Sequence, residues 1–170
     1  MIKTERLLLR PYRAEDLNPL YEYLADLEVV KYEPYRPVSG LQEAREILEA
    51  RMRSPEFLAV EHQAEGRLIG NLYLGHREFD ALELGYVFHR AYWGQGYAAE
   101  ACRAAVRTAF EAGAHRIYAE CDPQNTASWR LLERLGFARE AHFRQNVFFW
   151  QDENGRPLWK DTYVYALLRE

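Results

Sequence analysis

Two glycines in a short loop form the first feature whose spacing suggests chemistry. Gly94-Gln95-Gly96 follows an alternating apolar run that ends near His89, and an alanine-rich helical pattern begins directly after the loop. Glycine lets a backbone turn sharply and approach a ligand closely. The free amides at a helix start also attract phosphate oxygens. The loop therefore indicates a phosphate-binding turn, and a plain strand-to-helix turn is the alternative.

The two better-known phosphate loops do not fit this segment. GxxxxGK[ST] is absent, and the third glycine of the dinucleotide pattern is missing. The segment YWGQGYAAEA after ELGYVFHRA resembles instead the pyrophosphate-binding loop Q/R-x-x-G-x-G/A of the GNAT N-acetyltransferase superfamily. A tryptophan stands at the Q/R place, as in the branch that acetylates ribosomal-protein N termini. The resemblance implies that the phosphates of acetyl-CoA bind at Trp93, Gly94, Gln95, Gly96, Tyr97 and Ala98.

A second segment, NTASWRLLERLGF, begins at Asn125. By itself it predicts a helix capped by Asn125, with Ser128 as its third residue. It also resembles the superfamily motif N-x-x-[A/S]-x-x-L-Y-x-x-x-G-F, in which the Asn contacts the pantetheine arm and the Tyr often protonates the departing thiolate. Leu132 stands at the Tyr place. The resemblance therefore implies that Asn125 and Ser128 contact the cofactor and that Ser128 is the leading candidate for protonating the thiolate.

Attack of an amine on a thioester needs a proton acceptor and donors for the oxyanion. Glu83, on the strand that leads into the glycine loop, is the first candidate base, directly or through water, and Glu120 on the next strand is the second. Either could be an ordinary surface carboxylate. The resemblance places the thioester beside the first of these strands, so the amides around Val87 and Phe88 are the expected oxyanion donors.

The acceptor is less well specified. Superfamily members have the acceptor site next to the region of Tyr32 and Tyr35, so these tyrosines either line a substrate pocket or pack their loop onto the body. An α-amine of pKa about 8 loses its proton more easily than a lysine amine of about 10.4, which favours a protein N terminus. The alternatives are a small amine (polyamine, aminoglycoside or amino-acid derivative) and a non-catalytic acyl-CoA-binding sensor, which the Leu132 departure suggests.

Hydrophobic periodicity predicts the elements that must position these residues. Strands are expected over 6–13, 57–62, 68–74, 81–89, 116–121, 143–150 and 158–168. Helices are expected over 14–27, 41–52 (capped by Ser39), 97–112 and 126–135. This order matches the one that the resemblance implies. We therefore expect a single domain, 1–170, of the α/β class, with a GNAT-like mixed, mostly antiparallel sheet flanked by helices.

Composition narrows the function classes. The 170 residues carry a net charge of -4, which disfavours nucleic-acid binding as the main function. We expect a cytoplasmic protein without membrane partners, because there is neither a signal-peptide core nor a run of about 20 apolar residues. The two cysteines and five histidines lack metal-site spacing. An aromatic tail could form a homodimer face, an acceptor wall or sheet packing; it comprises Phe148, Phe149, Trp150, Trp159, Tyr163 and Tyr165.

Overall fold

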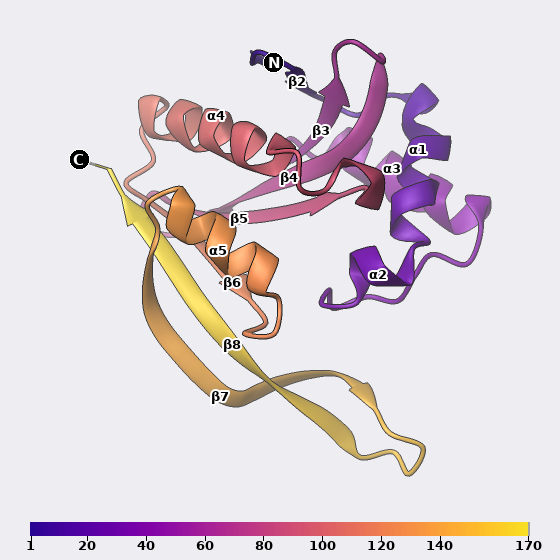
Figure 1. Ribbon diagram of the computed structural model, residues 1–170, viewed down its shortest axis with the longest axis vertical. Helices are drawn as coiled ribbons and strands as arrows, with labels where there is room; N and C mark the ends of the chain where they lie inside the picture. Colours follow the sequence, from indigo (N-terminus) through magenta and orange to yellow (C-terminus); the bar gives the residue numbers. More distant parts are fainter. Residues whose placement is uncertain (170) are drawn as a thin grey trace.

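The computed structural model describes residues 1–169, and Figure 1 shows their arrangement. The strands are β1 (Ile2–Lys3), β2 (Leu7–Arg10), β3 (Phe57–His62), β4 (Arg67–Arg77), β5 (Ala81–Phe88), β6 (Arg116–Cys121), β7 (Ala138–Gln151) and β8 (Pro157–Leu168). The α-helices are α1 (Leu17–Leu24), α2 (Leu27–Val30), α3 (Leu41–Arg53), α4 (Tyr97–Glu111) and α5 (Thr126–Arg134), and the short 3-10 helices are η1 (Ala14–Asp16) and η2 (Arg90–Tyr92).

The strands of this described part form one sheet in the order β1-β2-β3-β4-β5-β6-β8-β7. Only β5 and β6 pair in parallel there, and the other neighbouring pairs are antiparallel. The predicted α/β class with a mixed, mostly antiparallel sheet flanked by helices is confirmed. The single-domain prediction extends to residue 170, which lies outside the described residues.

Side chains of β5 alternate between two apolar cores, as a period of two requires. Leu82, Leu84 and Phe88 belong to the core that α4 and α5 cover. Val87 belongs to the second core, which α1, α2 and α3 cover. In Figure 1, α4 and α5 lie across the middle of the sheet, with α1–α3 grouped to one side. Burial on both faces therefore holds β5 rigidly in the middle of the molecule.

The two parallel strands separate soon after they meet. β5 and β6 pair only over Ala81–Glu83 and Arg116–Tyr118. Beyond this point the rest of β5, Leu84–Phe88, has its β4 neighbour on one side and no paired strand on the other in the described chain. The divergence opens a split in the sheet, whose walls are the second halves of β5 and β6.

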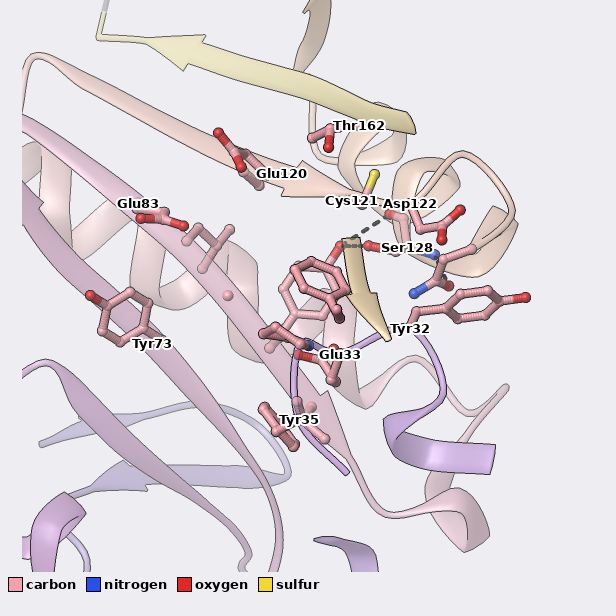
Figure 2. A pocket seen from close by; sticks show the side chains of 18 of the residues that line it. Tyr32, Glu33, Tyr35, Tyr73, Glu83, Glu120, Cys121, Asp122, Ser128 and Thr162 are labelled. Atoms are coloured by element: carbon pink, nitrogen blue, oxygen red, sulfur yellow. Dashed lines mark hydrogen bonds between the residues drawn. The ribbon is translucent and has the colours of Figure 1, made fainter. Parts of the chain in front are cut away.

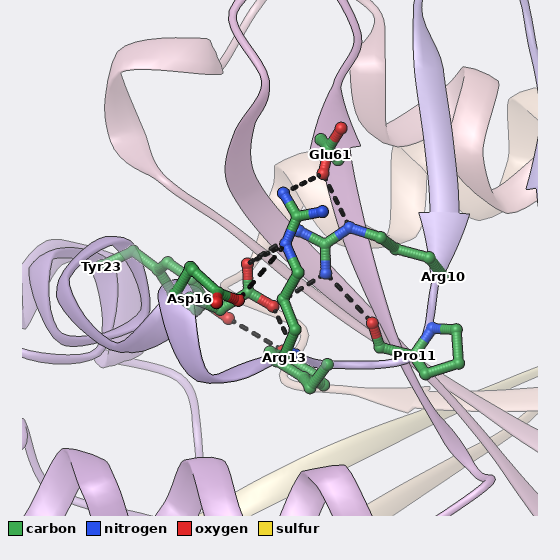
Figure 3. Close-up of polar contacts among 8 residues, drawn as sticks. Arg10, Pro11, Arg13, Asp16, Tyr23 and Glu61 are labelled. Atoms are coloured by element: carbon green, nitrogen blue, oxygen red, sulfur yellow. Dashed lines mark hydrogen bonds and ion pairs between the residues drawn. The ribbon is translucent and has the colours of Figure 1, made fainter.

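A buried ionic network anchors the first strand to the body (Figure 3). The guanidinium of Arg10 on β2 bonds both carboxylate oxygens of Asp16 at 2.8 and 2.7 Å, and its Nε bonds Glu61 on β3 at 2.7 Å. The backbone N–H of Arg13 donates to Asp16 at 2.9 Å. Arg10 and Asp16 are 4% and 2% exposed. The network therefore joins β2, η1 and β3 away from water.

Two helix predictions were wrong in detail. The helix expected over 14–27 is divided into η1, α1 and α2, because Asp26 adopts extended backbone and its side chain accepts the N–H of Glu28 at 3.0 Å. Such a side-chain cap starts a new helix at that point. The cap of α3 is Gly40 and not Ser39, whose N–H and hydroxyl both donate to Glu43 at 2.8 Å. No helix in the described residues is long and apolar enough to cross a membrane.

The last two strands form a long hairpin that extends beyond the rest of the sheet (Figure 1). β7 starts at Ala138, five residues before the predicted start, because its first residues already pair with β8. Some side chains of the aromatic tail are buried and others are exposed. Tyr165 is fully buried in the core, whereas Phe148 and Trp159 are 43% and 51% exposed and contact each other edge to face. Sheet packing thus accounts for part of this tail, and the homodimer face stays a prediction.

Candidate active site

The glycine loop lies between β5 and α4 and leaves helix amides open. Gly94 and Gly96 have φ values of +73° and +83°, a conformation that costs other residues about 1–2 kcal/mol. Because α4 begins at Tyr97, its first N–H groups have no acceptor within the helix. Among the described residues, nothing beyond its chain neighbours lies within 4 Å of a Cβ built on Gly94. The loop therefore offers amides and the positive helix end to a phosphate group.

Two side chains brace this loop. Arg6 donates to the carbonyl of Gln95 at 3.0 Å and pairs with Glu100 on α4 at 2.7 Å. The indole N–H of Trp93 donates to the carbonyl of Phe88 at 2.8 Å. Because Arg6 directly precedes β2, the loop is fixed both to the end of β5 and to the start of β2. Such fixed amides bind a phosphate with little further ordering.

A cavity of about 500 Å³ occupies the split between β5 and β6. Its walls come from β4, β5, the end of β6, the start of α5, the loop after α2 and the β7–β8 hairpin. In Figure 2 the acidic side chains Glu33, Glu83, Glu120 and Asp122 are seen around it. The cavity therefore has an acidic lining, which favours a positively charged ligand.

Ser128 and Tyr86 form a hydrogen-bonded pair on the cavity wall. The hydroxyl of Tyr86 lies 2.9 Å from Ser128 Oγ and donates to the Ser128 carbonyl at 3.0 Å. Asn125 caps α5, as predicted, by accepting the Ser128 N–H at 3.2 Å. Burial raises the pKa of Tyr86, so its phenol keeps its proton at neutral pH. The pair thus holds two hydroxyl protons at one point of the cavity.

Leu132, which stands at the tyrosine place of the motif, is fully buried in the core under α5. Its side chain has no proton to donate. Tyr86 brings a phenol to the cavity from β5, on the opposite wall from α5. The structure therefore supplies a tyrosine hydroxyl beside Ser128, although from a strand and not from the helix.

The two carboxylates that the sequence singled out lie at one end of the cavity. Glu83 forms an ion pair with Arg77 of β4, and Arg77 also donates to the hydroxyl of Tyr73 at 3.3 Å. Partial burial and the nearby Glu83 raise the pKa of Glu120, while Arg77 lowers it. In the described chain, no three His, Cys, Asp or Glu side chains are placed to share a metal ion. The Glu83 carboxylate is thus already engaged by a cation.

Glu33 points into the cavity from the loop after α2 (Figure 2). Burial raises its pKa to about 7. The charge of Arg51 and a hydrogen bond with Tyr35 oppose this rise. Arg51 is itself buried on α3, where it donates to Asn71 at 3.0 Å. A carboxyl group with a pKa near neutrality can hold or release a proton under ordinary conditions.

The strand register shows which amides of β5 face the split. His89 donates its N–H to Ile69 on β4 at 2.8 Å. Because the hydrogen-bonding direction alternates along an antiparallel strand, the amide of Val87 also faces β4. The amides of Tyr86 and Phe88 then face the split. Of the two amides expected to bind the oxyanion, that of Phe88 faces the split and that of Val87 faces β4.

The structure brings most of the predicted site residues together. One cavity is lined by Tyr32, Tyr35, Glu83, Val87, Glu120, Asn125 and Ser128. Phe88 and the loop Trp93–Ala98 do not line it; they lie at and beyond the end of β5, which connects the two parts of the site. Tyr97 is 9% exposed, so its side chain is packed in the core, and its backbone N–H is the group that remains for a ligand.

Sequence reasoning missed two polar groups of this cavity. Glu33 stands between the two tyrosines that the sequence singled out, and this position was the available signal. Tyr86 belongs to an alternating apolar run, so its period assigned it to the core. Its contact with Ser128 arises from the separation of β5 and β6, which no local pattern signals.

Comparison with known proteins shows the family. Residues 6–138 match the family model described as an acetyltransferase (GNAT) domain. The chain belongs to the GNAT acetyltransferase family. YnaD of Bacillus subtilis, named an uncharacterized N-acetyltransferase, is 33% identical over 99% of this chain and 97% of its own. A GNAT-family acetyltransferase from Bacillus anthracis superimposes with a TM-score of 0.88 at 32% identity, covering 98% of this chain and 97% of that one.

More distant GNAT structures show the shared fold alone. Ribosomal-protein-S5-alanine acetyltransferase from Vibrio fischeri has a TM-score of 0.80 at 20% identity, covering 99% of this chain and 96% of that chain. Spermidine N-acetyltransferase from Vibrio cholerae, in complex with CoA and spermine, has a TM-score of 0.80 at 22% identity, covering 97% of this chain and 96% of that chain. The resemblance to ribosomal-protein acetyltransferases therefore extends to the fold.

This GNAT protein is an acetyl-CoA-dependent N-acetyltransferase that acts on amines. The donor fits the residues present. The glycine loop has open helix amides that suit the pyrophosphate, and β5 connects that loop to the cavity in the split. An enzyme, and not the non-catalytic sensor, is thus the class to which the chain belongs.

Proposed function

We propose that the acceptor is a protein or peptide N terminus, whose α-amine enters the cavity in the split. One observation carries the proposal: Ser128, Tyr86 and several carboxylates line one cavity beside the strand that leads to the glycine loop. The carboxylates attract the ammonium form. Tyr32 and Tyr35 provide aromatic walls for the residues that follow it.

The expected reaction is a direct transfer. The neutral amine nitrogen bonds to the thioester carbon, and the oxyanion that forms accepts a hydrogen bond from one of the two amides that face the split, that of Tyr86 or that of Phe88. The carbon–sulfur bond then breaks, and the thiolate takes a proton from the hydroxyl of Ser128. The proton that the nitrogen loses as the amide forms restores that hydroxyl. We expect the hydroxyl of Tyr86, 2.9 Å from Ser128 Oγ, to orient the Ser128 hydroxyl for proton transfer to the thiolate. Close placement of amine and thioester supplies much of the rate, on the order of 7 kcal/mol.

An α-amine suits this site because it is easily deprotonated. With a pKa of about 8 it is roughly one-tenth neutral at pH 7, whereas a lysine amine is about 3 kcal/mol harder to deprotonate. A polyamine is the second candidate, and the several carboxylates of the cavity favour it. The reason is charge: a polyamine has several ammonium groups that could pair with these carboxylates, whereas a protein N terminus has one.

A panel of acceptors tests the proposal. The purified protein is given acetyl-CoA with N-terminal peptides, polyamines, an aminoglycoside and amino acids, and free thiol is measured. We expect the fastest release with unblocked peptides, and none with the same peptides acetylated at the N terminus. Release with polyamines alone would transfer the assignment to the second candidate. Acetyl-CoA binding without release for every amine would contradict the proposed acceptors.

Ser128→Ala should lower kcat by about 10²-fold, a usual contribution of one proton donor, with nearly unchanged acetyl-CoA affinity. The alanine keeps the helix and the N–H bond to Asn125, so the hydroxyl is the group lost. Thr126→Ala, on an exposed position of the same helix, is the matched control. Steady-state kinetics and calorimetry measure both effects. Full turnover by Ser128→Ala would remove Ser128 from the mechanism.

A further inference from the structure

The acidic side chains of the cavity fall into two groups. Burial and the charge of Glu83 raise the pKa of Glu120, and the guanidinium of Arg77 is paired with Glu83. Glu33 lies at the other group of polar residues, where its charge raises the pKa of Tyr86, the partner of Ser128. Figure 2 shows Glu33 and Ser128 among the side chains that line the same cavity, with Glu83 and Glu120 also on its wall.

Glu33 also differs from Glu83 in what already holds its carboxylate. Glu83 has an ion pair, whereas Arg51 influences Glu33 through charge alone and Tyr35 is its hydrogen-bonding neighbour. Both glutamates line the cavity, so both are open to a ligand. A base must be unoccupied and within reach of the proton that it removes. Glu33 meets the first condition better and lies on the Ser128 side of the cavity.

We propose that Glu33 is the general base that takes the proton from the acceptor ammonium, an assignment that rests on the proposed function. One N–H bond breaks and the proton goes to the Glu33 carboxylate, which leaves a lone pair on nitrogen. That pair forms the bond to the thioester carbon. The carbon–sulfur bond breaks, the departing thiolate takes its proton from Ser128, and the second proton that the nitrogen loses as the amide forms restores the Ser128 hydroxyl. The carboxyl then returns its proton to solvent before the next turnover.

Its surroundings support this use. The buried carboxyl has a pKa of about 7, so it is substantially ionised at neutral pH and still a useful proton acceptor. The other titratable and charged groups that line the cavity come from each element around it: Tyr32 and Tyr35 of the same loop, Arg51 of α3, Tyr73 of β4, Glu83 and Tyr86 of β5, Glu120 and Cys121 of β6, Asp122 after it, and Lys160 and Asp161 of β8.

The pH dependence of kcat/KM tests the assignment. With the best acceptor of the panel, the wild type should rise with pH to a plateau with a midpoint near 7. Glu33→Gln should be about 10²-fold slower at pH 7. Its rate should keep rising to the pKa of the amine itself, about 8 for an α-amine. Glu33→Asp keeps a carboxylate and should keep the midpoint near 7 at a reduced rate.

The other two cavity glutamates are the matched controls. Glu83→Gln and Glu120→Gln should keep the midpoint near 7. If the midpoint survives in Glu33→Gln, or moves in Glu83→Gln instead, the assignment to Glu33 is wrong. Thermal unfolding and acetyl-CoA calorimetry on each variant show that it is folded and binds the donor. A wild type that releases no thiol with any amine overturns the proposed function itself, a result distinct from an unchanged pH profile.

Discussion

Gly96→Val is expected to weaken acetyl-CoA binding by about 30- to 150-fold. Gly96 has a φ of +83° at the start of α4, where a β-branched residue cannot sit without moving the backbone. That movement takes the first amides of α4 away from the phosphates. Losing one or two hydrogen bonds to a charged group costs about 2–3 kcal/mol, which corresponds to this change in Kd. Calorimetric titration with acetyl-CoA measures it.

Gly113→Val is the matched control for this change. Gly113 follows the other end of α4, with a φ of +109° and open space around a built Cβ. The substitution imposes similar backbone strain far from the loop, so stability should fall in both variants but affinity in Gly96→Val alone. Equal affinities for the two variants and the wild type would show that the loop does not hold the phosphates.

Asp16→Ala should lower the free energy of unfolding by about 3 kcal/mol. Removing one partner of a buried ion pair leaves the other charge desolvated, which typically costs about 3–5 kcal/mol. The remaining bond from Arg10 to Glu61 places the expected loss at the low end. The side chains of Arg10 and Asp16 are 5% and 3% exposed, so water cannot replace the lost partner. Urea unfolding monitored by fluorescence measures the loss.

An exposed ion pair provides the comparison for the buried network. Arg107 and Glu111 on α4 have side chains that are 71% and 68% exposed. Glu111→Ala should therefore change stability by less than about 0.5 kcal/mol. Asp16→Ala combined with Arg10→Met removes both buried charges and should recover part of the loss. If Asp16→Ala unfolds at the same urea concentration as Glu111→Ala, the network does not stabilise the fold.

Local periodicity was sufficient for most elements of this fold. The helical spacing in α4 and α5 is strong because each helix buries one continuous face, and β5 alternates because its side chains enter two cores in turn. The errors occurred where side chains compete with the backbone. Asp26 caps a new helix within a run of helical pattern, and Glu43 binds Ser39 one residue before the true cap. Such local hydrogen bonds leave no periodic signal.

The sequence by itself determined the family, the glycine loop and the absence of the usual tyrosine at Leu132, because these depend on residues close together in the chain. Only the tertiary structure decided which groups share the cavity. Glu33, Tyr86 and Ser128 come from a loop, a strand and a helix, and they meet because β5 and β6 separate after three paired residues. That separation, and the desolvation that raises the pKa of Glu33, depend on packing between distant segments.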